Sequence, residues 1–117
     1  MKRRLLAKLL ASMAVCFGTT VYAAIGPTQT SLKITSMYAI GGSNAIYVSF
    51  QSGAMPGCYG SSGGYLYTSN TLFKEIYAQL LMIAATGGIQ ASVVFTQNVV
   101  TNNWSDCTID GIYLIPQ

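Results

Sequence analysis

The sequence contains no histidine and only three carboxylates among its 117 residues. Histidine is the commonest general base and metal ligand near neutral pH, so acid–base and metal chemistry lack their usual groups. The carboxylates are Glu75, Asp106 and Asp110, and nothing in their spacing pairs two of them as a glycosidase requires. No serine lies in a Gly-x-Ser-x-Gly motif, and a serine would lack its histidine base. We therefore expect no enzymatic activity, no cofactor and no metal site.

The chain is also poor in charge, and its basic residues are confined to one end. Four of the six lysines and arginines lie within residues 1–8. Beyond them, Lys33 and Lys74 oppose the three carboxylates, which gives a formal charge of −1. A nucleic-acid-binding protein needs clustered lysine or arginine to neutralise phosphates, so we expect no nucleic-acid partner.

Residues 1–23 have the pattern of a bacterial secretory signal peptide. A basic start precedes an apolar run over 9–17, and Val21 and Ala23 suit a cleavage site. The run is shorter than the ~20 residues that span a bilayer, so we expect no stable membrane insertion. Cleavage is expected after Ala23 or one residue later. Residues 24–117 would then form a single small domain, periplasmic or secreted.

Cysteine usage agrees with export to an oxidising compartment. Cys58 and Cys107 remain in the exported part, and two cysteines in a small exported domain are typical of a disulfide. A reactive thiol is the other interpretation, but no histidine is present to activate it. A lipoprotein signal modified at Cys16 is the rival to simple cleavage, although Val15 is bulkier than the residue that such signals place there.

The exported part alternates polar and apolar residues as strands do. Ile46, Val48 and Phe50 lie at a period of two, and a Gly-Gly-Ser-Asn turn at 41–44 makes this segment one arm of a hairpin. The predicted strands are 31–40, 46–51, 65–67, 89–96 and 107–115, with loops at 53–64 and 97–106.

One segment changes period from 2 to 3.6. Residues 72–85 place apolar side chains along one face, which predicts a helix, and the glycines at 87 and 88 are typical of its end. A side chain within 69–71 is expected to cap its start. The element order β-β-β-α-β-β predicts an α+β, mainly β fold. We interpret it as a five-stranded OB-like, partly open barrel with one helix and one disulfide.

The outer face of the predicted helix carries little charge. Ala78, Met82 and Ala85 follow one another along it, and small residues allow a second copy of the chain to approach closely. Such a stripe favours a homo-oligomer. Alanine is also a strong helix former, so an exposed and unpartnered face is the other interpretation.

With this order in place, a resemblance can be stated. The run from Tyr67 to Phe95 contains an aromatic-rich helix, a Thr-Gly stop at Thr86 and Gly87, and a strand from Gln90. It resembles the helix-then-strand core of small secreted bacterial OB-fold proteins, such as the B subunits of subtilase-cytotoxin-like and pertussis-like toxins. The resemblance implies a ring-forming, glycan-binding subunit. It carries over no binding residue, and those subunits tend to have more disulfides.

Two aromatic-bearing loops could bind a ligand, and a Cys58–Cys107 bond would tether them to each other. Aromatic faces flanked by amides and hydroxyls suit uncharged polar ligands. In the other interpretation these rings only cover a small core. The candidate ligand-binding residues are Tyr59, Tyr65, Tyr67, Asn102, Asn103 and Trp104.

The sequence therefore favours an exported, non-enzymatic binding module that recognises a glycan or a protein surface, with self-association through the helix. A periplasmic inhibitor or immunity-type protein that docks on one enzyme is the alternative. A small exported enzyme is a third interpretation, against which the lack of histidine stands. Asp106, beside Cys107, is expected to be a turn residue of its loop.

Overall fold

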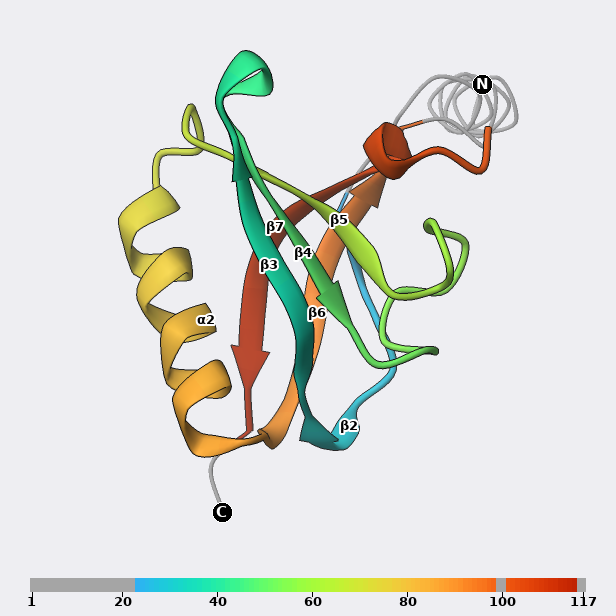
Figure 1. Ribbon diagram of the computed structural model, residues 1–117. Coiled ribbons are helices and arrows are strands. Elements are labelled where there is room, and N and C mark those ends of the chain that lie inside the picture. Colours follow the sequence, from blue (N-terminus) through green and yellow to red (C-terminus); the bar gives the residue numbers. More distant parts are fainter. Residues whose placement is uncertain (1–22, 99–100, 116–117) are drawn as a thin grey trace, which may run out of the picture.

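The structure is a computed structural model that describes residues 23–98 and 101–115. This part is mainly β-structure with one α-helix, as the element order predicts, and its strands belong to one sheet that is not closed (Figure 1). The predicted leader up to residue 22, with Cys16, lies outside the described residues. Within the described ranges no helix is long and apolar enough to cross a membrane.

The sheet has seven strands rather than the predicted five. Its order is β1-β6-β7-β5-β4-β3, and β2 also pairs with β6. The pairs are antiparallel except for β5 with β7, which is parallel. The strands are β1 (Ala24–Ile25), β2 (Gln29–Leu32), β3 (Ile34–Ile40), β4 (Ala45–Phe50), β5 (Gly63–Tyr67), β6 (Ile89–Gln97) and β7 (Cys107–Leu114).

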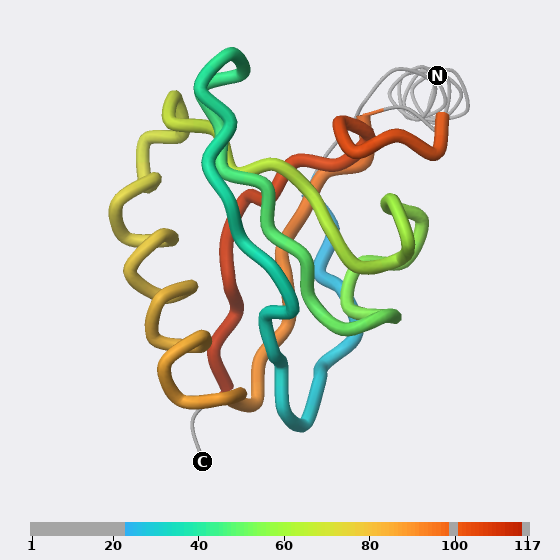
Figure 2. Tube along the Cα trace, in the orientation of Figure 1, coloured from blue at the N-terminus to red at the C-terminus, as the bar shows by residue number. Residues whose placement is uncertain are grey.

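The extra strands arise in the N-terminal segment, where a single strand over 31–40 was expected. This segment is broken at Lys33, so that β2 pairs with β6 while β3 pairs with β4. At the break the Lys33 amide donates to Gln51 Oε1 at 2.8 Å, and Gln51 Nε2 donates to the Ser31 carbonyl at 2.8 Å. The Gln51 side chain thus supplies the backbone partners that a continuous strand would have had. Figure 2 shows this segment turning sharply between its two partners.

The one α-helix of the described residues, α2 (Phe73–Thr86), begins and ends one residue later than predicted. Its N-cap is Leu72, which makes no side-chain cap bond, so the predicted cap within 69–71 is wrong. Asn70 Oδ1 instead accepts from the Leu72 amide at 2.8 Å and stabilises the turn before the helix. The predicted stop is confirmed, because Gly87 has a left-handed φ of 78°.

The core lies between α2 and the sheet. The helix buries Ile76, Leu80 and Ile83, and it contacts both β3 and β7. Their spacing of four and three residues is the predicted apolar stripe. Strands β4 and β6 contribute alternate side chains, as a period of two requires. The largest fully buried side chains include Phe50, Leu32, Met55, Leu66, Ile109, Val48 and Val93.

Candidate binding site

Three tyrosines form a row across neighbouring strands. Tyr38 on β3 is the register partner of Tyr47 on β4, and Tyr47 is the partner of Tyr65 on β5. The ring centroids of Tyr38 and Tyr47 are 5.5 Å apart, and those of Tyr47 and Tyr65 are 5.6 Å apart. Tyr67 lies two residues further along β5, on the same face, at 5.7 Å from Tyr65. Directly opposed residues in a sheet share a face, so register alone brings these rings together.

A tryptophan from a distant segment lies against this row. Trp104 begins η2, a short 3₁₀ helix (Trp104–Asp106) just before β7. Its ring centroid lies 5.7 Å from that of Tyr47, 6.5 Å from that of Tyr38 and 6.0 Å from that of Tyr59. Such distances are those of packed aromatic pairs. We call the six rings the aromatic cluster; its members are Tyr38, Tyr47, Tyr59, Tyr65, Tyr67 and Trp104.

The cluster has a buried centre and an exposed rim. Tyr47 retains 4% of its exposure, whereas Trp104 retains 46%, Tyr38 41% and Tyr59 38%. Burial raises the pKa of the Tyr47 phenol above its ordinary value of 10.0, and a hydrogen bond with Ser49 opposes that rise. Since Tyr47 points away from the Val48 side of β4, it is the rings around it that cover this side chain.

A glycine makes room for the centre of the cluster. Gly63, at the start of β5, is buried, and a Cβ built on it would overlap the hydroxyl of Tyr47. A Cβ built on its neighbour Gly64 would lie 2.9 Å from the carbonyl oxygen of Cys107. The glycine pair therefore allows both the Tyr47 ring and β7 to approach β5.

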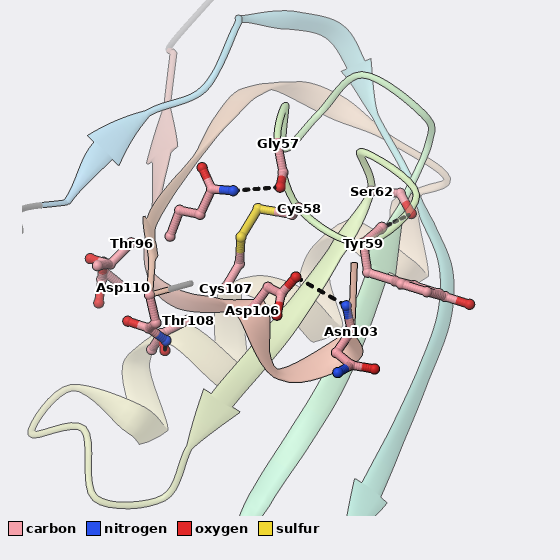
Figure 3. The surroundings of a disulfide bond; sticks show 12 residues. Gly57, Cys58, Tyr59, Ser62, Thr96, Asn103, Asp106, Cys107, Thr108 and Asp110 are labelled. Carbon is pink, nitrogen blue, oxygen red and sulfur yellow. Dashed lines mark hydrogen bonds between the residues drawn. A yellow bond between two sulfur atoms is a disulfide. The ribbon is translucent and has the colours of Figure 1, made fainter. Parts of the chain in front are cut away.

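The predicted disulfide is confirmed and lies directly beside the cluster. Cys58 and Cys107 are bonded, with their Cα atoms 5.7 Å apart. Figure 3 shows how the bond brings the loop that carries Gly57 and Tyr59 next to the segment that carries Asn103 and Asp106. A second tether is the Gln97 side chain, whose Nε2 donates to the Gly57 carbonyl at 2.7 Å. Tyr59 and Trp104 therefore come from two loops that are joined at their bases.

The Asp106 carboxylate organises the loop that presents Trp104. It accepts from the backbone amides of Thr101 and Asn103, each at 3.0 Å, and from the Thr101 hydroxyl. These bonds hold the pKa of Asp106 below its ordinary value of 3.8, and the bond from the Thr101 hydroxyl contributes most to that lowering. The side chain is buried, and Figure 3 shows it beside the disulfide with its bond to Asn103. Asp106 is thus a turn residue, as expected, whose carboxylate is bonded within its own loop.

The structure brings four of the predicted binding residues into the cluster: Tyr59, Tyr65, Tyr67 and Trp104. Asn102 and Asn103 are exposed in the adjoining loop. Asn102 has a left-handed φ of 60°, which asparagine tolerates better than most residues, and this accounts for its presence at the turn.

Two members of the cluster were missed by sequence reasoning. Tyr38 and Tyr47 lie in the predicted strands 31–40 and 46–51, but neither is among the predicted binding residues. The signal that could have found them is the turn at 41–44. Because Ile40 pairs with Ala45 across that turn, Tyr38 must oppose Tyr47.

The outer face of α2 is exposed and weakly charged. Ala78, Met82 and Ala85 all face solvent, and Met82 is 41% exposed. Leu81 beside them is 44% exposed. The exposed apolar face of α2 is thus wider than the predicted stripe.

The other carboxylates do not join the cluster. Asp110 on β7 accepts from the Thr96 hydroxyl at 2.6 Å, and Glu75 is exposed in the first turn of α2. The described residues contain no group of three or more His, Cys, Asp or Glu side chains that could hold a metal ion.

We compared the chain with protein-family models, with curated proteins and with solved structures, and none of the three comparisons found a match. Its function must therefore be inferred from its own geometry.

Proposed function

We propose that this protein is an exported, non-enzymatic binding module that recognises a glycan or the surface of another protein through the aromatic cluster. The observation that carries the proposal is the half-exposed indole of Trp104, which is packed on the buried ring of Tyr47. Large, rigid aromatic side chains bury much area on binding and lose little conformational entropy. They are correspondingly frequent at sites that dominate binding energy.

The way in which the cluster is held supports binding over mere covering of the core. The rim rings come from two loops that a disulfide, a Gln97–Gly57 bond and the Asp106 carboxylate hold in place. A preorganised surface pays less ordering entropy when a ligand arrives. The disulfide also agrees with export to an oxidising compartment, periplasmic or extracellular.

We further propose that copies of the chain associate through the exposed face of α2. Ala78, Met82 and Ala85 give a low, apolar surface on which another copy can pack. Light scattering at high protein concentration tests this directly. Met82→Glu should shift an oligomer to the monomer, whereas the same charge at exposed Ser52 should not. A wild-type protein that is monomeric at high concentration would contradict self-association.

The proposed fold is a five-stranded OB-like, partly open barrel in which β1, β2 and β3 count as one interrupted strand. Two features support it: this segment pairs with β6 at one end and with β4 at the other, and β5 meets β7 in parallel. The resemblance of residues 67–95 to toxin B subunits favours the same fold, a glycan ligand and a ring of copies. An experimental structure that gives the strand pairing would test it.

The binding proposal is tested with two immobilised probes. The exported protein is applied to a glycan array and, separately, is used to capture proteins from a periplasmic and culture-medium extract. Wild-type protein should be retained on one of the two, and Trp104→Ala should lose most of that binding. Capture of a single enzyme, lost with Trp104→Ala, would identify the inhibitor alternative.

The matched control is Tyr113→Ala. Tyr113 is 54% exposed on β7 and is not in the cluster, so its loss should leave binding unchanged. Binding that persists fully in Trp104→Ala, or that falls equally in Tyr113→Ala, would show that the cluster is not the site.

A further inference from the structure

We infer that the ligand of the aromatic cluster is an uncharged carbohydrate, with one sugar ring stacked on Trp104. The inference rests on the proposed binding function and deepens it by assigning the ligand class. Three features of the cluster favour this ligand: its exposed rings, the hydroxyl groups beside them, and the lack of available charge among the described residues that surround them.

The exposed rings gather around one indole and form an aromatic platform. Trp104 covers Tyr47 with one side, since Tyr47 is almost fully buried while the indole remains nearly half exposed. The Tyr38 and Tyr59 rings stand at steep angles to the indole, 77° and 69°. Both tyrosine rings thus contact the indole at steep angles, and the exposed part of the indole is available to a flat group.

A pyranose ring fits such a platform chemically. One of its faces presents C–H groups that carry a small positive charge, and the face of an indole is electrically negative. The sugar hydroxyls project from the rim of the ring, where they need hydrogen-bonding partners. Two phenols contact Trp104, and in the described part of the chain no hydrogen bond occupies the hydroxyl of Tyr38 or Tyr59.

Two serines continue the platform along the strands. Ser36 on β3 opposes Ser49 on β4, which opposes Gly63 on β5, one pair further along the face that carries the tyrosines. By contrast, the exposed aliphatic side chains of the described residues lie elsewhere, such as Leu81 and Met82 on α2. Aromatic rings with hydroxyls and without aliphatic groups favour a sugar over the apolar core of a protein interface.

Among the described residues, the elements that carry the cluster contain no available charge. Neither Lys33 nor Lys74 lies in β3, β4, β5 or the 101–106 loop. The Asp106 carboxylate is buried and is already bonded to Thr101 and Asn103. An acidic sugar would find no cation here to replace its hydration, whereas a neutral sugar needs none. Binding should therefore be insensitive to salt.

The single tryptophan of the sequence makes the test direct, because its fluorescence reports only this site. The exported protein is titrated with lactose, maltotriose, cellotriose and chitotriose as neutral probes, and with sialyllactose and trigalacturonate as acidic ones. At least one neutral probe should change the emission saturably, with equal affinity at low and high salt. Tyr38→Ala and Tyr59→Ala should each weaken it about tenfold. Tyr113→Ala should not.

Two further variants keep the test independent of folding. Tyr38→Phe and Tyr59→Phe retain the rings and remove only the hydroxyls, and each should weaken binding about threefold or more. Calorimetry with Trp104→Ala should detect no binding of the probe.

Three outcomes would overturn the inference. A response to acidic probes only, or an affinity that falls steeply with salt, would assign an anionic ligand. No response to any sugar, together with protein capture that depends on Trp104, would assign a protein ligand and leave the proposed function standing. Failure of both sugars and protein capture would remove the proposed function as well.

Discussion

Trp104 covers Tyr47: their ring centroids are 5.7 Å apart at an interplanar angle of 36°, although one residue lies on β4 and the other just before β7. The contact buries a phenol on the outer face of the sheet, where a strand residue would ordinarily meet water. Of the other exposed rings, Tyr38 contacts both members of this pair, and Tyr59 contacts Trp104. The stability of the sheet face and the proposed binding site therefore depend on the same contact.

Removal of the indole should lower the pKa of Tyr47. Burial is what raises that pKa above 10.0, so Trp104→Ala should return it toward the ordinary value. A group with a raised folded-state pKa stabilises the fold at neutral pH, and this contribution disappears as the pH rises through that pKa. The variant should also lose roughly 1–3 kcal/mol at neutral pH through its three ring contacts. Alkaline titration of tyrosinate absorbance and denaturant unfolding measure the two effects. An unchanged titration curve would mean that Trp104 does not cover Tyr47.

Gly63→Ala should destabilise the protein because the new methyl group would overlap the Tyr47 ring. Overpacking of this kind costs about 1–3 kcal/mol. Gly42→Ala is the control, since a Cβ there meets nothing within 4 Å. In a Tyr47→Phe background, part of the Gly63→Ala loss should be recovered, because the hydroxyl is the nearest atom. Strictly additive losses in thermal or denaturant unfolding would contradict this contact.

Reduction of the Cys58–Cys107 bond should lower stability clearly. The cysteines are 49 residues apart, and the chain-entropy model gives roughly 4 kcal/mol for a loop of that length. Thermal unfolding with and without a reductant measures the difference. The Cys58→Ser, Cys107→Ser double variant should unfold as the reduced protein does and should not respond to the reductant. If the wild type melts at the same temperature under both conditions, the bond does not contribute.

Acid should release the loop that carries Trp104. The folded-state pKa of Asp106 lies below 3.8, so its stabilising contribution is complete above that pH and is lost as the pH falls through the folded-state value. Between neutrality and about pH 4 the emission of Trp104 should stay constant, and below that range it should move toward that of exposed indole.

Asp106→Asn provides the comparison for the acid experiment. It keeps the size of the side chain but removes the negative charge of the carboxylate, whose Oδ2 accepts from the Thr101 and Asn103 amides. Its Trp104 emission at neutral pH should already resemble that of the acidified wild type and should change little on acidification. A variant that follows the wild-type curve would rule out Asp106 as the titrating group.

Local elements of this fold were predictable where one face of a segment is buried. The helix was expected over 72–85 and is found at Phe73–Thr86, because its apolar residues recur every three or four positions. The strand after it, expected over 89–96, is found at Ile89–Gln97, whereas β5 begins at Gly63, two residues before the expected 65–67. The helix cap was wrong because Asn70 can satisfy a nearby amide in a turn as readily as at a helix start.

The count of strands was not predictable from alternation. Residues 31–40 look continuous in sequence, but the break at Lys33 depends on the Gln51 side chain, which arrives from another segment. The two-residue strand β1 exists only because β6 offers it partners. Pairing of this kind is decided by what lies next to a segment in space.

The sequence alone determines that the chain has few groups for acid–base chemistry, two cysteines able to pair, one amphipathic helix and several tyrosines. These properties depend only on composition and local periodicity, so they require no knowledge of distant contacts. Tertiary structure decided that Tyr38, Tyr47 and Tyr65 form one row and that Trp104 closes over it. The row depends on strand register, and the tryptophan depends on a disulfide and a buried carboxylate that position its loop. The turn at 41–44 indicates the Tyr38–Tyr47 pair, but the contacts of Tyr65 and Trp104 with Tyr47 join segments further apart in the chain, and no local pattern records them.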